Sequence, residues 1–248
     1  MRLTGGQGTA WRSGNVVLKP LDMTVAELAW QAEVLGSLAC DGFRVARPLA
    51  AGDGSLVVDG WTARQALEGS HREGCWPEVI AVGERFHAAL AATTRPGFLD
   101  LRSDRWAIGD RVAWGELPAE EFSGVKHVPR LVAALQPLDA SGQIVHGDLT
   151  GNVLFSDELP PAVIDFVPYW RPPGFASAVV VADALVWEGA DETLLGSVAH
   201  VDEFPQYLLR ALIYRAVTDR LFRLDEPLRA DDDDPYLPAV ELALGLAG

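Results

Sequence analysis

Residues 144–155 read IVHGDLTGNVLF, in which two apolar runs enclose the polar residues His146, Asp148 and Asn152. An apolar lead-in of this kind is typical of a buried β-strand, and the glycines mark turns. Two interpretations are open from this stretch alone. It is either a catalytic loop that moves a phosphoryl group or a strand–turn–strand hairpin with similar letters. The rest of the chain decides between them.

The segments before this stretch predict short strands around one helix. Residues 4–19, TGGQGTAWRSGNVVLK, predict a glycine-rich turn, a polar turn and a β-branched strand that ends at Lys19. Residues 24–39 predict a helix, because Thr24 can serve as its N-cap and Glu27 as the capping-box partner. Two further strands are expected at residues 43–50 and 55–63.

Helices dominate the chain after residue 68. One hairpin is expected there, between the opening stretch and PAVIDFV, residues 161–167. Apolar residues at helical spacing predict the helices 77–93, 129–137, 174–188, 204–223 and 236–246. A small strand-rich half followed by a larger helical half predicts an α+β, two-lobed fold, with one lobe at residues 1–66 and the other at 67–248.

Composition and charge narrow the class of protein. The 248 residues are 49% hydrophobic, which is enough to bury a substantial core. No apolar run approaches the roughly 20 residues that span a bilayer, and no signal peptide is visible, so we expect a cytoplasmic protein without a membrane partner. A net charge of −15 argues against a nucleic-acid partner, because phosphate backbones need a basic surface. Cys40 and Cys75 predict two reduced thiols.

The order of the polar motifs is typical of phosphoryl transfer from ATP. A glycine loop can cover the phosphates with its backbone N–H groups, a strand lysine can pair with phosphate oxygens, and a helix carboxylate can hold that lysine. Farther along, an Asp can take the proton of the acceptor hydroxyl, while an Asn and a second Asp hold the metal ions. Each motif is weak alone, and the complete set in this order favours a kinase.

The chain resembles the aminoglycoside phosphotransferase and choline kinase-like family, whose fold is that of the protein kinases. The matching motifs are GGQGTAW, VVLK, the helix around AWQAEVLGSL, HGDLTGN and VIDF. The family has HGD where protein kinases have HRD, so the resemblance implies a small-molecule kinase. It implies ATP and Mg²⁺ as cofactors and a small hydroxyl-bearing acceptor. The chain also resembles an actinobacterial branch of that group.

The resemblance implies a role for each matching polar residue. Asp148 would be the catalytic base, and Asn152 with Asp165 would be the Mg²⁺ ligands. Lys19 would contact the ATP phosphates. His146 would lie beneath the catalytic loop and orient it.

The same resemblance implies a nucleotide site around the strand lysine. The glycine loop would cover the phosphates, and the backbone near Gln65 and Leu67 would bind adenine. Glu33 is the first choice for the carboxylate that holds the lysine, Glu27 is the second, and Gln31 in that place would remove the ion pair. The glycines of the loop are Gly5, Gly6 and Gly8.

Three features depart from the family's pattern. The family has four residues between the base and the metal-binding Asn, whereas this chain has three, and Gly151 can supply the backbone angles of a tighter loop. Val167 and Pro168 follow IDF in place of glycine, and the first strand before the glycine loop is short or missing. These departures support a rival hypothesis, a nucleotide-binding pseudokinase with a regulatory or scaffolding role.

The acceptor pocket is predicted at two segments, residues 102–116 and 168–176. Aromatic rings near arginines could hold a ring-bearing or anionic acceptor. The residues concerned are Trp106, Trp114, Tyr169, Trp170, Arg105, Arg111 and Arg171. Glu188, Asp191 and Glu192 could instead attract a cationic amino sugar, and the two interpretations conflict. Asp183 resembles a family residue that ties the helical lobe together, so we expect it to be structural.

Overall fold

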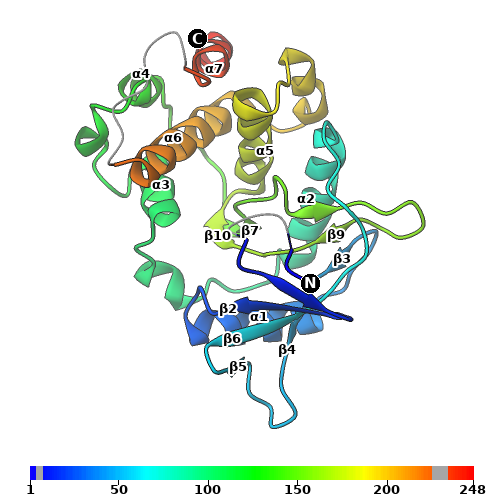
Figure 1. Ribbon diagram of the computed structural model, residues 1–248. Helices are drawn as coiled ribbons and strands as arrows, with labels where there is room; N and C mark the ends of the chain where they lie inside the picture. Colours follow the sequence, from blue (N-terminus) through cyan, green and yellow to red (C-terminus); the bar gives the residue numbers. More distant parts are fainter. Residues whose placement is uncertain (4–7, 225–233) are drawn as a thin grey trace.

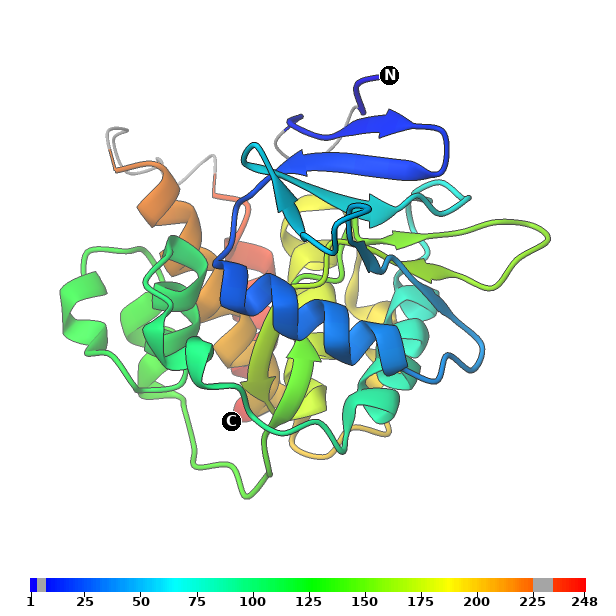
Figure 2. The same cartoon turned by 90° about the horizontal axis from the view of Figure 1, so that it is seen from below.

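A small antiparallel sheet and a larger group of helices form the two parts of the molecule (Figure 1). The structure, a computed structural model, describes residues 1–3, 8–224 and 234–248. The helices lie on one side of the sheet, and α1 (Val25–Ser37) lies along its face (Figure 2). The predicted α+β architecture is confirmed.

Five short strands form the sheet, in the order β1–β2–β6–β4 with β5 paired to β6. They are β1 (Trp11–Ser13), β2 (Val16–Pro20), β4 (Pro48–Leu49), β5 (Val57–Val58) and β6 (Trp61–Gln65). The strand predicted at 55–63 is wrong in one respect, because it is a hairpin that turns at Asp59 and Gly60. Both residues have positive φ, 49° and 78°, as the two-residue turn of a hairpin requires.

Helix α1 begins where its N-cap predicts. Thr24 Oγ1 accepts the backbone N–H of Glu27 at 3.1 Å, which satisfies one of the unpaired donors of the first turn. The reciprocal half of the predicted capping box is wrong, because the Glu27 carboxylate is buried and contacts Gln31 Nε2 at 3.4 Å. The face of α1 that meets the sheet therefore carries polar side chains.

Two strand pairs bring the motif-bearing loops together. The predicted hairpin is confirmed as β8 (Val153–Leu154) paired with β9 (Ala162–Val163), and a second pair that was not predicted joins β7 (Gln143–His146) to β10 (Pro168–Arg171). The loop 147–152 and the loop 164–167 each connect one pair to the other, so they lie at the same end of both. Strand β3 (Arg44–Val45) pairs with β9, so the N-terminal half contributes to this region. The division at residue 66 stays a prediction.

The helical part is built around α5 and α6. Nine residues of α5 are apolar and buried, as expected of a helix surrounded by others, and α6 packs against α3, α4, α5 and α7. The bounds are α2 (Trp76–Leu90), α3 (Arg105–Ala113), α4 (Val128–Ala133), α5 (Pro173–Trp187), α6 (Phe204–Phe222) and α7 (Leu237–Ala247), with 3₁₀ turns at Gly97–Leu101, Ala119–Phe122 and Glu192–Val198. Of the helices in the described ranges, none has the length and apolar composition that crossing a bilayer needs.

Candidate active site

Lys19 on β2 joins the sheet to the loop after β9. Its Nζ lies 3.0 Å from Asp165 Oδ1, 3.2 Å from Asp165 Oδ2 and 2.7 Å from Asp22 Oδ2. Burial alone would lower the pKa of Lys19, but the two carboxylates outweigh it and raise that pKa. Two residues that are 146 positions apart in the chain thus meet at one point, as the order of the motifs predicts.

Asp165 is held in a conformation that few non-glycine residues adopt. Its φ is +47°, in the left-handed region, and its side chain is 46% exposed. Burial of part of the carboxyl group would raise its pKa, yet the pairing with Lys19 lowers it. Backbone strain of this kind concentrates at functional sites, and here it turns an ionised carboxylate toward the lysine.

His146 lies fully buried beneath the loop 147–152. Its Nδ1 accepts the backbone N–H of Asp148 at 3.1 Å, and its Nε2 lies 3.2 Å from the carbonyl oxygen of Ile164. Nε2 therefore carries the ring proton. The N–H of His146 donates to His87 Nε2 at 3.0 Å, so two buried imidazoles support the loop. The position of His146 is the one that the resemblance implies, and its orienting role stays a prediction.

The short spacing between Asp148 and Asn152 is absorbed by a tight turn. Gly151 adopts a φ of +75°, which is the backbone freedom predicted for it, and Asn152 N donates to Leu149 O at 2.9 Å. Asn152 Nδ2 donates to the carbonyl oxygen of Asp148 at 2.7 Å. Because the amide nitrogen is committed to that bond, Asn152 presents its amide oxygen to a cation.

Asn152 and Asp165 are the oxygen donors that a cation would find here. The N–H of Ile164 donates to Asn152 O at 3.0 Å, which brings the residue before Asp165 against Asn152. Within the described ranges, no group of three or more His, Cys, Asp or Glu side chains could hold a metal by itself. One carboxylate and one amide oxygen nevertheless suit Mg²⁺, which in phosphate-transfer sites takes most of its ligands from phosphates and water.

Arg215 is a site residue that the sequence did not reveal. From α6, its Nη2 donates to Asp148 Oδ1 at 2.7 Å, and its Nε and Nη2 donate to the two oxygens of Asp183 at 2.7 and 2.5 Å. Burial alone would lower the pKa of Arg215, but the two carboxylates raise it well above its usual value. Asp183 therefore ties α5 to α6 and, through Arg215, to the candidate base. This agrees with the structural role expected for Asp183.

The predicted partner of Lys19 is corrected by the structure. Glu33 is exposed on α1, and both of the described partners of Lys19 are aspartates. Gln31, two positions earlier, occupies the buried face and donates to Phe166 O at 3.1 Å. Residues two positions apart on a helix point about 200° away from each other, so only one of Gln31 and Glu33 can face the sheet. The alternative without an ion pair to α1 therefore holds.

The other residues predicted for the nucleotide site are the glycines of the loop and the segment at Gln65 and Leu67. Gly5 and Gly6 lie outside the described residues, and Gly8 has a φ of +64°. Gln65 N donates to Arg47 O and Ala66 N to Asn15 O. Leu67 N–H has no backbone partner among the described residues, so it is the donor of this segment that adenine could use. The adenine-binding role of Gln65 and Leu67 stays a prediction.

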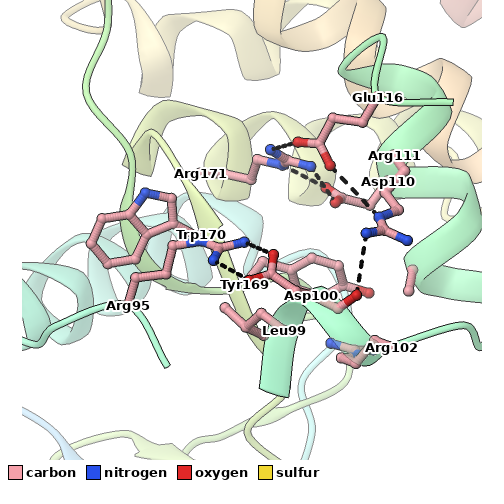
Figure 3. A pocket seen from close by; sticks show the side chains of 11 residues that line it. Arg95, Leu99, Asp100, Arg102, Asp110, Arg111, Glu116, Tyr169, Trp170 and Arg171 are labelled. Atoms are coloured by element: carbon pink, nitrogen blue, oxygen red, sulfur yellow. Dashed lines mark hydrogen bonds and ion pairs between the residues drawn. The ribbon is translucent and has the colours of Figure 1, made fainter. Parts of the chain in front are cut away.

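One cavity, of about 110 Å³, is formed by the segments predicted to bind the acceptor (Figure 3). Its charged groups neutralise one another, because Arg171 contacts Asp110 at 2.6 Å and Glu116 at 2.6 Å, and Arg95 pairs with Asp100. The lining residues are Arg95, Leu99, Asp100, Arg102, Ala107, Asp110, Arg111, Glu116, Tyr169, Trp170 and Arg171. Arg171 pairs with Gln143 at the end of the β7–β10 ladder opposite the loop 147–152. Tyr169, which also lines the cavity, packs against Gly147, so the cavity extends from that end of the ladder toward the loop.

A second cavity, of about 240 Å³, adjoins the candidate base. Arg215 lines it and also contacts Asp148. The other lining residues are Trp106, Trp187, Thr218, Asp219, Phe222 and Arg223. The rings of Trp106 and Phe222 meet edge to face, with 4.7 Å between centroids. Of the predicted acceptor residues, Trp106 lies here, whereas Trp114 packs in the core against Phe175.

The acidic residues considered for an amino sugar are engaged elsewhere. Glu188 accepts a hydrogen bond from Trp76 Nε1 at the start of α2. Asp191 caps a 3₁₀ turn by accepting the N–H of Thr193 at 3.0 Å. Glu188, Asp191 and Glu192 are absent from the linings of both cavities, as far as the described residues define them.

Comparisons with known proteins show the family of the chain and proteins of similar fold. The model of the phosphotransferase enzyme family matches residues 10–169, which include Lys19, Asp148, Asn152 and Asp165. No curated protein sequence matches the chain.

Solved structures are similar to the chain in fold. One is a thermostable mutant of aminoglycoside phosphotransferase APH(4)-Ia in ternary complex with AMP-PNP and hygromycin B (TM-score 0.58, 15% identity, 100% of this chain and 92% of that chain). Others are spectinomycin phosphotransferase APH(9)-Ia in complex with ADP and spectinomycin (0.54, 14%, 100% and 91%) and a choline/ethanolamine kinase family protein from Mesorhizobium loti (0.54, 17%, 100% and 86%). These likenesses confirm the predicted protein-kinase-like fold.

Proposed function

The chain belongs to the phosphotransferase enzyme family, and from this premise we propose that it transfers the γ-phosphoryl group of ATP to a hydroxyl group of a small molecule. The observation that carries the proposal is the meeting of four motif residues from distant segments. Lys19 pairs with Asp165, and Asn152 bonds to Asp148 in the neighbouring loop. Phosphoryl transfer needs such a lysine, metal ligands and base in one place. Neighbours of the same fold that bind AMP-PNP or ADP support the same donor.

Asp148 acts as the base in the proposed reaction. The acceptor oxygen forms a bond to the γ-phosphorus while the bond from that phosphorus to the β–γ bridging oxygen breaks, which yields ADP and a phosphate monoester. The hydroxyl proton passes to Asp148. Oδ1 of Asp148 already accepts from Arg215 at 2.7 Å, whereas Oδ2 has only a long contact of 3.4 Å with Asn152 Nδ2. Oδ2 is therefore the atom that takes the proton.

Asn152 and Asp165 would hold Mg²⁺. The ion would supply charge neutralisation on the phosphates when bound. Both oxygens of Asp165 currently accept from Lys19, so Lys19 has to release at least one of them. A lysine released in this way can pair with a phosphate oxygen, and Asp22, at 2.7 Å, keeps it close to the site.

We assign the acceptor to the cavity of about 240 Å³ that Arg215 lines, because Arg215 also contacts Asp148. Trp106, Trp187 and Phe222 supply aromatic surface on which a ring can pack. Arg215 separates this cavity from Asp148 Oδ1, so the acceptor hydroxyl has to reach past the guanidinium to Oδ2. A ring-bearing acceptor is thus favoured over a cationic amino sugar.

A thermal-shift titration followed by a turnover assay tests the function. ATP with MgCl₂ should raise the melting temperature, because a ligand that binds only the folded state stabilises it. ADP release with a panel of hydroxyl-bearing compounds should then identify an acceptor, and Asp148→Ala should abolish release while keeping the thermal shift. A shift without turnover across the panel would instead support the nucleotide-binding pseudokinase. No shift would contradict both functions.

A further inference from the structure

Arg64 on β6 is a buried cation, and none of the roles predicted from the sequence explains it. Its side chain is 7% exposed, its Nη2 donates to Gln31 Oε1 at 2.7 Å, and the same nitrogen lies 4.0 Å from Met23 Sδ. Nη1 is buried and has no hydrogen-bond partner among the residues that the structure describes. A buried donor without a partner costs free energy, so a folded protein retains one only for a reason.

The strand register puts Arg64 on the same face of the sheet as Lys19. In the β2–β6 pair, Lys19 lies opposite Thr62 and Val17 lies opposite Arg64. Residues two apart on a strand point to the same face, and diagonal neighbours across a pair are about 7–8 Å apart, within reach of long side chains. Gln31 of α1 meets Arg64 on this face. Both cations therefore extend into the region between the sheet and α1.

The groups around Arg64 leave its charge incompletely paired. Its strong partner Gln31 is a neutral amide, while Asp22 and Asp165 are bonded to Lys19. Burial lowers the pKa of Arg64, while the charges of nearby Asp165, Asp22 and Glu27 oppose that shift, Asp165 the most. Arginine stays protonated even so. The site thus contains a charged guanidinium, close to Asp165, with an N–H group that lacks an acceptor.

We propose that Arg64 binds a phosphate oxygen of the nucleotide as a second cation beside Lys19. The inference rests on the proposed function and specifies the part of the nucleotide that this residue recognises. A triphosphate offers anionic oxygens, and hydrogen bonds between a guanidinium and phosphate are among the strongest in proteins. The N–H of Nη1 would gain its missing acceptor, and the guanidinium would gain a charge-assisted hydrogen bond.

Three ligands distinguish binding of the phosphates from binding of the adenosine part of ATP. Isothermal titration calorimetry measures the affinities of the wild type and of Arg64→Met for ATP, inorganic tripolyphosphate and adenosine. Arg64→Met should lower the affinity for ATP and for tripolyphosphate by about 10- to 100-fold and leave the affinity for adenosine unchanged. Only ATP and tripolyphosphate carry the phosphate oxygens that Arg64 binds. Arg64→Lys should fall between, since lysine keeps the charge without the forked donors.

The melting temperature without ligand distinguishes binding from a purely structural role. Arg64→Met should change the melting temperature little, because loss of the hydrogen bond to Gln31 is offset by removal of a buried donor without a partner among the described residues. Arg210→Met is the matched control. Arg210 is 8% exposed and its Nε has no partner among the described residues, but it bonds to Gln136 and Gln206. Its loss should lower the melting temperature and leave ATP affinity unchanged.

Either of two results would overturn the inference. In the first, Arg64→Met binds ATP with the affinity of the wild type. In the second, its affinity for adenosine falls as much as its affinity for ATP. If Arg64→Met does not fold, Arg64→Gln, which keeps a polar group against Gln31, takes its place with the same expectations. A wild type that binds neither ATP nor tripolyphosphate would remove the proposed function itself. Normal binding by the wild type and by Arg64→Met would remove this inference alone.

Discussion

Two buried arginines border the candidate site, and they differ in how their charge is compensated. Arg215 donates to both oxygens of Asp183 and to Asp148, so its charge has two counter-charges. Arg64 donates to the neutral amide of Gln31, and its Nη1 has no partner in the described part of the chain. The base side of the site is complete without a ligand, whereas the nucleotide side is not.

This difference separates two uses of a buried charge. A buried cation with matched carboxylates fixes the positions of those carboxylates, and its removal leaves them uncompensated. A buried cation with an unused donor lowers stability until a ligand supplies the acceptor. Arg215 should therefore matter for folding and for the position of the base, and Arg64 for the binding of phosphates.

The largest effect is expected from Asp148→Asn. The amide keeps an oxygen for Arg215 but cannot accept a proton, so turnover should fall by about 10²- to 10⁴-fold. ADP release with an identified acceptor measures the turnover, and calorimetry should show that ATP affinity is unchanged. If ATP affinity fell together with turnover, the base side and the nucleotide side would not be separate in function.

Arg215→Met should cause the next largest effect, on stability. It leaves Asp183 buried without its cation, and breaking a buried pair in this way lowers the free energy of unfolding by about 3–5 kcal/mol. Urea unfolding measures the change. Asp183→Asn in the same chain should restore part of the loss, because it removes the uncompensated charge.

The exposed pair of Arg130 and Glu241 provides the control for Arg215. Their side chains are 53% and 54% exposed, so solvent already screens the pair, and Arg130→Met should change stability little. A comparable loss of unfolding free energy in both variants would show that the Asp183–Arg215–Asp148 network stabilises the fold no more than an exposed ion pair does.

The sequence predicts that the motif residues lie together because each one lies next to a strand. Lys19 ends a β-branched run, and Asp148 and Asp165 follow apolar runs. Strand ends that pair place such residues together, and a family resemblance supplies the pairing. The hairpin at Asp59 and Gly60 carried a local signal as well, since Asp-Gly between apolar runs is typical of a two-residue turn.

The supporting arginines escape prediction because their partners are distant in sequence. Arg215 interrupts the apolar run ALIYRAV, which indicates a buried charge, yet nothing local identifies Asp148, 67 positions away, as its partner. The choice between Gln31 and Glu33 fails for a related reason. Both lie in one amphipathic helix, and only tertiary packing fixes which side faces the sheet.

His87 should make stability depend on pH below neutrality. Burial, with the neighbouring His146, lowers the pKa of His87 from its usual 6.5 to about 3. Between these values the unfolded chain takes up a proton that the folded chain excludes, so this group lowers the free energy of unfolding by about 1.4 kcal/mol for each pH unit of acidification. Above pH 6.5 both states are neutral and the contribution to the slope vanishes.

Urea unfolding at several pH values compares the wild type with His87→Gln. The Gln side chain can accept the N–H of His146 but does not titrate, so the variant should lose this part of the slope. His71→Gln, at an exposed position, is the control for removing an imidazole. An identical slope in the wild type and His87→Gln would mean that the support beneath the catalytic loop is not a neutral buried histidine.

The smallest effect is expected from Gly151→Ala, and Gly189→Ala is its matched control. The two glycines have φ of +75° and +74°, and a Cβ at either would meet no atom within 4 Å. Alanine in the left-handed region should therefore lower the free energy of unfolding by about 1–2 kcal/mol at both positions. Only Gly151 lies in the tight turn that aims Asn152, so only Gly151→Ala should raise the Mg²⁺ concentration needed for half-maximal ATP binding. Equal Mg²⁺ requirements in the two variants would mean that the shortened loop does not position a metal ligand, and the turn at Gly151 would then serve the chain path alone.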